Sequence, residues 1–556
     1  MRAILVTTIP VVLVLLVVLV ASSFISRVLP AAVPRPLVQM AIGALIGLSP
    51  ALQVDLDPQL FFLLFVPPLL FFDGWRIPNE DLVHDRVVNL QLALGLVAFT
   101  VVGIGWFVHW LIPGMPLAVA FAFAAAVSPT DAISVTSTAG NLPIASRMMR
   151  ILSSESLLND ATGLVCLHFA VVAVLTGNFF LSQALLDFMW IATGGIALGF
   201  ATTLVVAGGS NLLALRMGEE AGVQIVTSVL IPFLAYALAE ALHCSGVLAA
   251  VSAGLAMSYV ETSGIASATT RVQRTSVWET IHFATNGIVF ILLGEQLPKL
   301  IAATDRALYA VGERHVSWLL LYVIVIYAAL IVIRCLWLAI VLPRELLWAN
   351  NSRSIRQFKW RELAVMTLAS PRGAITLAGA MTLPFWLRDG VPFPGRDMVI
   401  LLAMGIILIS LIAAGTALPA LLRTMDTTEP SNDRQENMAR VFSAKAALDA
   451  VSRIEQDLKG ANAYNDNHAH ALSRLNELYS TVIESKSRDG RAAEKSRETE
   501  SVGRELRISA IKAERDAIFE LLREQKIDSE LADKLIRELD LLQTHHDEQQ
   551  DPKSKR

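Results

Sequence analysis

Two short polar motifs lie inside stretches of sequence that are otherwise almost wholly apolar. The first is Ser128-Pro129-Thr130-Asp131, and the second is Glu155-Ser156-Leu157-Leu158-Asn159-Asp160. A charged side chain at the centre of a membrane helix costs roughly 2.5–3.5 kcal/mol on insertion scales. A chain that keeps Asp131, Glu155 and Asp160 there is expected to use them, and the usual use is to move protons or cations.

The spacing within the second motif places oxygen-bearing side chains on one side of a helix. Ser156, Asn159 and Asp160 lie at positions i, i+3 and i+4. Hydroxyl and amide oxygens beside one carboxylate form the kind of shell that a small hard cation prefers. Asp131 supplies a second carboxylate or fixes the first, and free carbonyls such as that of Thr130 complete the predicted site for a transported Na⁺.

The charges in these apolar segments do not cancel. Asp131, Glu155 and Asp160 carry three negative charges, and Arg334 and Arg372 carry two positive charges. One negative charge is left over, which either one monovalent cation or one proton can neutralise. Competition between the two ions for one carboxylate is enough to make an exchanger.

We predict Asp160 as the carboxylate for which the two ions compete. Burial favours the neutral form of a carboxylate, so its protonation comes within reach of neutral pH. Backbone donors at the N-terminus of a half-helix are expected to hold Asp131 in its charged form. The alternative is that all five charges form structural ion pairs. It explains Glu155 with Arg372, but it does not explain the surplus charge.

Apolar stretches of spanning or nearly spanning length recur through residue 421. They fall at 4–25, 36–49, 59–72, 87–111, 117–139, 148–176, 180–206, 221–241, 245–260, 277–297, 317–341, 362–385 and 397–421. The chain is therefore predicted to be an all-α polytopic membrane protein with about 13 transmembrane helices. An odd number puts the termini on opposite faces. Fourteen Lys and Arg residues fall in the loops on one side and five on the other, which predicts an external N-terminus and a cytoplasmic C-terminal tail.

The two halves of this membrane part carry matching interruptions. Segments one to six and eight to thirteen are predicted to form two inverted repeats, and the fifth segment of each contains a Ser-Pro pair, Ser128-Pro129 and Ser370-Pro371. Proline removes a backbone donor and clashes with the preceding turn, so both helices are expected to break. Paired breaks in inverted repeats point to a transporter's site at the membrane midplane. The alternative is a pair of ordinary proline kinks.

The distribution of charge divides the chain into two domains. Residues 1–423 contain 23 Lys+Arg and 22 Asp+Glu, and residues 424–556 contain 22 and 27. The first domain is apolar, and the second is predicted to be a soluble helical tail because apolar residues recur at helical spacing, as at Ile508, Ile511 and Ile518. The tail either solubilises the protein or stabilises a dimer, or it binds a cytoplasmic regulator.

Other classes of function find little support. Near-neutral charge gives no reason to expect nucleic acid as a partner. The sequence has no GxxxxGK[ST] loop, no zinc pattern, no cofactor fingerprint and no nucleophile–base arrangement, so neither an ATP-driven pump nor an enzyme is expected, and no cofactor. Cys166, Cys244 and Cys335 show no metal-ligand spacing and are interpreted as packing residues.

Five motifs together resemble a known family. They are Phe65-Val66-Pro67-Pro68-Leu69-Leu70-Phe71, Ser128-Pro129-Thr130-Asp131, Glu155-Ser156-Leu157-Leu158-Asn159-Asp160, Glu240-Ala241-Leu242-His243-Cys244-Ser245-Gly246-Val247-Leu248-Ala249 and Arg372-Gly373-Ala374. Over about residues 1–423 the chain resembles sodium/proton antiporters of the first cation:proton antiporter family. That family includes the bacterial NhaP-type proteins and the animal sodium/hydrogen exchangers. The long charged tail resembles that of some bacterial members.

The resemblance implies a fold and a mechanism. The fold is the NhaA-like antiporter fold, with two broken, crossing helices, in a homodimer of the cell (inner) membrane whose core domain moves as an elevator. The residue matching Asp160 binds cation and proton in turn, those matching Asp131, Ser156 and Thr130 help to form the site, and Glu155 and Arg372 form a structural ion pair. Arg334 is assigned to the same structural ion pair from the charge count. Asn159 before Asp160 is associated with electroneutral exchange.

One position departs from the family pattern. Members often carry an acidic residue directly after the Pro-Pro-Leu-Leu-Phe run, where this chain has Phe72 and then Asp73. One residue further along a helix turns the side chain by roughly 100°. Asp73 is therefore left out of the predicted site.

The function expected from these observations is exchange of cytoplasmic Na⁺ (or Li⁺ or K⁺) for external protons, with a role in pH homeostasis. A second hypothesis keeps the fold and transports potassium or an organic ion. A third is a membrane sensor that signals through the tail, although the tail carries no kinase or cyclase motif.

Overall fold

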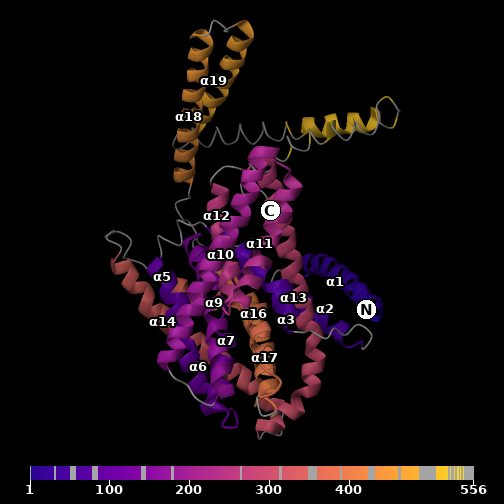
Figure 1. The fold of residues 1–556 in the computed structure, drawn as a ribbon, viewed down its shortest axis with the longest axis vertical. Coiled ribbons are helices and arrows are strands. Elements are labelled where there is room, and N and C mark those ends of the chain that lie inside the picture. The colour runs from indigo at the N-terminus through magenta and orange to yellow at the C-terminus, as the bar shows by residue number, and fades with distance from the viewer. Residues whose placement is uncertain are drawn as a thin grey trace. The chain divides into compact units, whose positions relative to one another are not determined.

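A computed structural model describes most of the chain. It covers residues 2–29, 33–49, 58–77, 86–139, 144, 146–176, 181–262, 266–311, 316–348, 360–387, 391–423, 433–460 and 465–487, and short stretches between 507 and 543. The chain divides into two compact units, Met1–Thr427 and Thr428–Arg556, and each is described by itself (Figure 1).

The first unit is built from helices, and its described residues contain no strand longer than the isolated bridge between Trp386 and Pro392. The helices up to the first break are α1 (Arg2–Val28), α2 (Arg35–Gly47), α3 (Pro58–Arg76), α5 (Arg86–Leu90), the π-helical turn η2 (Gln91–Leu96), α6 (Val97–Leu111) and α7 (Leu117–Val127). Those that follow are α8 (Ala132–Ala139), α9 (Ser146–Thr176), α10 (Leu181–Met217), α11 (Ala221–Ala241), α12 (Gly246–Thr262), α13 (Ala268–Val311), α14 (Val316–Trp348), α15 (Trp360–Leu368), α16 (Ala374–Met381) and α17 (Arg396–Leu422).

Helices occupy every apolar stretch that the sequence marks. Within the described residues, seven are long and apolar enough to cross a membrane: Val87–Leu111, Met148–Thr176, Met189–Met217, Ala221–Ala241, Ala268–Ala302, Ser317–Val341 and Arg396–Leu422. Large apolar side chains such as Trp110 and Val205 are exposed on these helices, as lipid contact requires. The prediction of an all-α polytopic membrane protein is confirmed, and the number of helices that cross the bilayer stays a prediction.

Packing contacts among the described helices fall into two groups. Group A consists of α1–α3 and α10–α13, in which α2 packs along α13 and α3 along α12. Group B consists of α5–α9 with η2, and α14–α17, in which α7 packs on α9 and on α16. Figure 1 shows α7, α9 and α16 close together in the centre of the unit. Fewer contacts, chiefly those of α13 with α17, join the two groups.

Group A is held together by close approaches at glycine. A Cβ atom at Gly43 on α2 would clash with the carbonyl oxygen of Ile291 on α13, and one at Gly294 on α13 would clash with that of Met40. Small residues let helix backbones approach closely in a membrane, where packing rather than water exclusion drives association. The α2–α13 pair therefore depends on the absence of side chains at these positions.

Both predicted helix breaks are present. The helix that begins at Leu117 ends at Val127, and α8 starts only at Ala132. In the same way α15 ends at Leu368, and α16 starts at Ala374. The prolines at 129 and 371 account for these interruptions because neither can continue an α-helical hydrogen-bond ladder. The Asp131 N–H donates to the Pro371 carbonyl at 2.8 Å, so the two breaks lie against each other.

One local feature was not predicted. The stretch 87–111 reads as one continuous helix in the sequence, but residues Gln91–Leu96 form a π-helical turn. The indole N–H of Trp337 on α14 donates to the Gln91 carbonyl at 3.2 Å. A donor that takes a carbonyl from the ladder is a known cause of such a bulge, and it depends on a residue far away in the chain.

The second unit begins with two helices that lie side by side, α18 (Asp433–Gly460) and α19 (Asp466–Ser487) (Figure 1). Ala444 is buried in this unit. Further along, residues 509–521 are helical, with Ile511 buried, as the apolar spacing predicted. Ile508, which belongs to the same predicted pattern, lies outside the described residues.

A glycine replacement tests the packing of group A. Gly294→Ala should lower the Tm of the detergent-solubilised protein, because overpacking costs about 1–3 kcal/mol and the obstructing atom is backbone. Gly208→Ala on α10 is the matched control, since no atom lies within 4 Å of its added methyl group. Equal Tm values for the two variants would contradict the packing described for α2 and α13.

Candidate ion-binding site

The first break is fastened to α9 by side chains from the second motif. The Asn159 amide donates to the Thr130 hydroxyl oxygen at 2.8 Å, and the Thr130 N–H lies 3.5 Å from the Asn159 Oδ1. The Ser156 hydroxyl donates to the Thr130 carbonyl at 2.7 Å and accepts from the Ala132 N–H at 3.3 Å. The polar side chains that spacing alone assigned to one stripe of a helix thus satisfy backbone groups that the proline break leaves free.

Asp131 caps the half-helix that follows the break. Its Oδ1 accepts from the Ser134 N–H at 3.3 Å, and its Oδ2 accepts from the Ser134 hydroxyl. This is the N-cap arrangement, in which the positive end of the helix favours a carboxylate. A Cβ atom at Gly373, which precedes α16, would lie 2.8 Å from the Asp131 Oδ2. The carboxylate therefore sits where two half-helices begin, as its predicted backbone donor requires.

Asp160 is in a different situation. It is buried, with 7% of its surface exposed, and none of the described residues donates a hydrogen bond to its carboxylate. The charges acting on it are the carboxylates of Asp131 and Asp73. An ionised carboxylate surrounded only by negative charge is costly until a cation or a proton neutralises it. This is the property that the sequence predicted for the exchanging residue.

A cavity of about 40 Å³ joins these groups. One water molecule needs roughly 10–15 Å³ by the same measure, so an ion with part of its hydration fits. Oxygen-bearing side chains from both helix groups line it: Asp73, Thr130, Asp131, Ser156, Asp160, Asn286 and Thr376. Asn159 is buried behind the wall and holds Thr130.

Asp73 is the carboxylate that the sequence left out. It lines the cavity with Asp131 and Asp160, and its Oδ1 lies 3.4 Å from the Nε2 of His282 on α13. The imidazole ring also lies 5.2 Å from the ring of Phe72, centroid to centroid. An offset of one residue from the family pattern did not remove this carboxylate from the site, because α3 turns this face toward the cavity. The available signal was an acid directly after the apolar run of residues 59–72.

The ion pair differs from the one expected. The resemblance paired Glu155 with Arg372, but both carboxylate oxygens of Glu155 accept from Arg334 on α14, one of them at 2.8 Å. The Arg334 Nε also donates to the Met366 carbonyl at 3.1 Å. Arg372 instead donates to the carbonyls of Val127 at 2.9 Å and Ser370 at 2.5 Å. The Arg372 guanidinium thus donates to backbone carbonyls that the two helix breaks leave without a helical partner. These carbonyls lie near helix C-terminal ends, which favour positive charge.

These placements change the charge count. Glu155 and Arg334 cancel each other, which leaves the carboxylates of Asp73, Asp131 and Asp160 with one Arg. The surplus is therefore two negative charges, one more than the sequence count, because Asp73 also lines the cavity.

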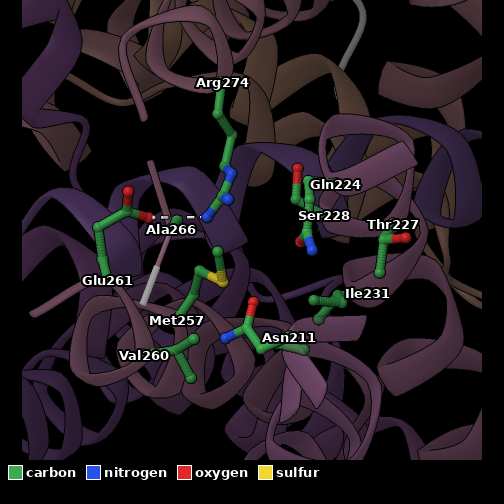
Figure 2. Close-up of a pocket in the computed structure, with 11 residues that line it drawn as sticks. Asn211, Gln224, Thr227, Ser228, Ile231, Met257, Val260, Glu261, Ala266 and Arg274 are labelled. Carbon is green, nitrogen blue, oxygen red and sulfur yellow. Dashed lines mark hydrogen bonds and ion pairs between the residues drawn. The ribbon is translucent and has the colours of Figure 1, made fainter. Parts of the chain in front are cut away.

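A second polar cavity, of about 10 Å³, lies among α10, α11, α12 and α13 (Figure 2). Its one carboxylate, Glu261, pairs with Arg274 at 3.0 Å, so its charges cancel. The Trp278 indole N–H donates to the Ser228 Oγ at 3.0 Å on its border. The volume suits about one water molecule. This cavity has no surplus charge and is too small for a partly hydrated ion, so it is not a candidate site.

Beside this second cavity, the loop between α10 and α11 is tied to the start of α13. The Ser267 N–H donates to both carboxylate oxygens of Glu219, at 3.2 and 3.1 Å. The Thr270 hydroxyl and this N–H hold the pKa of Glu219 below its usual value, since both stabilise the charged form. Glu219 lies between two spanning helices and not in the ion cavity.

Comparison with known proteins identifies relatives of this chain. A family model described as "Sodium/hydrogen exchanger, transmembrane" matches residues 12–424. The chain is 38% identical over 550 residues to the uncharacterized Na(+)/H(+) exchanger YjcE of Escherichia coli (strain K12), covering 96% of this chain and 97% of that protein. It is 33% identical over 531 residues to the sodium, potassium, lithium and rubidium/H(+) antiporter of Bacillus subtilis (strain 168), covering 94% and 76%.

A solved structure resembles the fold. The sodium proton antiporter MjNhaP1 from Methanocaldococcus jannaschii at pH 8 matches with a TM-score of 0.54 and 16% sequence identity, covering 75% of this chain and 99% of that one. At this identity the likeness concerns the fold alone. It agrees with the helical architecture expected from the sequence.

The Glu155–Arg334 pair allows a test of what holds the site together. Arg334→Met should strongly reduce the yield of folded protein, because removing one partner of a buried pair costs about 3–5 kcal/mol. The double variant Glu155→Leu/Arg334→Met should recover much of that loss, since no buried charge is left alone. Size-exclusion profiles and Tm values of detergent-solubilised protein measure both effects. A double variant less stable than Arg334→Met would contradict the pairing.

Proposed function

This chain belongs to the family of transmembrane sodium/hydrogen exchangers, and we propose that it exchanges cytoplasmic Na⁺, Li⁺ or K⁺ for external protons as a secondary active transporter. The family resemblance in the sequence is thereby confirmed. The observation that supports exchange most directly is Asp160, a buried carboxylate in a cavity with two other carboxylates and without a donor among the described residues.

In this proposal Asp160 binds the cation and the proton in turn. Asp131 and the Ser156 hydroxyl contribute oxygens to the cation, with the Thr130 carbonyl near the break, and Asn159 fixes Thr130. A cation that arrives displaces the proton, because the two neutralise the same charge. The transported ions are the substrates, and the proposal includes no other cofactor.

We further propose that group B moves against group A as an elevator. Three features support this motion: the cavity is lined from both groups, the broken helices belong to group B, and few contacts join the groups. The same proposal includes about 13 transmembrane helices in two inverted repeats of the NhaA-like kind, and a homodimer.

The remaining parts of the proposal follow from the sequence. Residues 1–423 form the exchanger domain, with the N-terminus outside the cell (inner) membrane, and residues 424–556 form a cytoplasmic helical domain open to a regulator. Exchange is electroneutral and serves pH homeostasis. The loop distribution of Lys and Arg supports the orientation, and Asn159 before Asp160 supports electroneutrality through the family resemblance.

A second candidate is exchange of K⁺ in preference to Na⁺. It is favoured by the Bacillus subtilis relative, whose name includes potassium, lithium and rubidium. Transport of an organic ion is a weaker alternative, because the cavity of about 40 Å³ is small. Proton flux in proteoliposomes with a panel of alkali cations, at clamped membrane potential, separates these alternatives and measures electroneutrality.

Replacement of Asp160 tests the exchange reaction. Asp160→Asn should reduce cation-dependent proton flux in proteoliposomes to the level of empty vesicles. The neutral amide lacks the negative charge for which the cation and the proton compete. Asp397→Asn is the matched control: its carboxylate is 59% exposed at the start of α17, and the flux should be unchanged. Retained flux in a folded Asp160→Asn protein would falsify the assignment.

Deletion of residues 427–556 tests the sensor hypothesis and the role of the tail. The membrane unit is compact by itself, so exchange should continue in the truncated protein, with a changed pH dependence if the tail is regulatory. The same liposome assay measures both. Complete loss of exchange in a correctly folded truncated protein would favour a tail that is required for function.

A further inference from the structure

One buried hydroxyl group at the cavity lacks a hydrogen-bond partner. Thr376 on α16 lines the cavity with Asp131 and Asp160, it has no exposed surface, and its Oγ1 has no partner among the described residues. No other buried hydroxyl oxygen in the described part of the chain is in this state. A buried polar atom left unpaired costs about 1–3 kcal/mol, so this position needs a reason.

The helix break explains why the hydroxyl is free. Other threonines in this protein donate to the carbonyl four residues earlier, as Thr162 does to Leu158 at 2.9 Å and Thr367 to Leu363 at 2.7 Å. Thr376 lies in the first turn of α16, and the residue four positions earlier, Arg372, lies in the non-helical break. Its carbonyl is not aligned with a helix axis, so the usual internal partner is missing.

We propose that the Thr376 hydroxyl oxygen is a ligand of the transported cation and sets the affinity for it. A neutral hydroxyl oxygen suits an alkali cation, and the site would then be closed by oxygens from α9, from the first break and from the second broken helix. This inference rests on the proposed exchange function and assigns a residue to the cation alone.

The assignment separates the two competing ions. A proton bound to Asp160 needs no further oxygen ligand, whereas a cation gains from each one. Loss of the hydroxyl therefore weakens the cation-bound state and leaves the proton-bound state unchanged. When two ions compete for one site, a cation that binds with lower affinity is displaced by the proton at a lower proton concentration.

The test uses the full-length protein and two variants. Thr376→Val is isosteric and lacks the hydroxyl, and Thr376→Ser keeps it. Thr376→Val should raise the KM for Na⁺ roughly threefold to tenfold and leave kcat unchanged. This is the size expected for the loss of one interaction with a neutral oxygen. At a fixed sodium concentration the acid limb of its pH profile should move to higher pH. Extrapolated to zero sodium, the limb should coincide with that of the wild type. Thr376→Ser should resemble the wild type.

Binding of sodium to the purified protein by calorimetry separates this inference from the proposed function. Stability is a second readout: without sodium, Thr376→Val should have a Tm at or above that of the wild type, since it removes a buried hydroxyl that has no partner, and the rise in Tm with sodium should be smaller. Wild type that binds sodium no better than Thr376→Val overturns the role of Thr376 alone, as does a Thr376→Ser variant as weak as Thr376→Val. Wild type that binds none of Na⁺, Li⁺ and K⁺ in the same measurement overturns both proposals.

Discussion

A single buried carboxylate without a neutralising partner in the described chain sets the terms for the rest of this structure. Asp160 is enclosed, and the nearest charges are those of Asp131 and Asp73. The membrane interior tolerates such a group only when it is paired, protonated or bound to an ion. The other charged residues nearby have contacts of their own: Arg334 neutralises Glu155, and Arg372 donates to the carbonyls of the breaks. Asp131 accepts from Ser134, and Asp73 lies 3.4 Å from His282. What is left is one place where an ion is required.

The rigid surroundings keep that place open. The two breaks are joined through the Asp131 N–H and the Pro371 carbonyl, the first break is fixed to α9 by Asn159 and Ser156, and the Ser410 hydroxyl accepts from the Arg372 N–H at 2.9 Å. These contacts use the backbone groups that proline leaves unpaired. The cavity does not collapse onto Asp160 because its walls are held by their own hydrogen bonds.

The sequence predicted the parts of this arrangement that depend on local order along the chain. Proline predicted the breaks, and helical spacing predicted that Ser156 and Asn159 would act together. It did not predict the parts that depend on distant residues. The partner of Glu155 is set by where α14 packs, and the π-helical turn is set by the Trp337 indole. Asp73 was excluded by an angle within its own helix, although its place at the cavity depends on how α3 packs in the fold.

The division of the cavity wall between the helix groups has a consequence for the two sides of the membrane. Asp73 and its neighbour His282 belong to group A, while Asp131 and Asp160 belong to group B. If the groups slide, Asp160 and Asp131 travel together, and Asp73 stays behind. The ion then meets three acids in one orientation of the protein and two in the other. Such a transporter is asymmetric. It binds the ion more tightly on one side of the bilayer, and transport in the two directions proceeds at unequal rates when the ion gradients are equal and opposite.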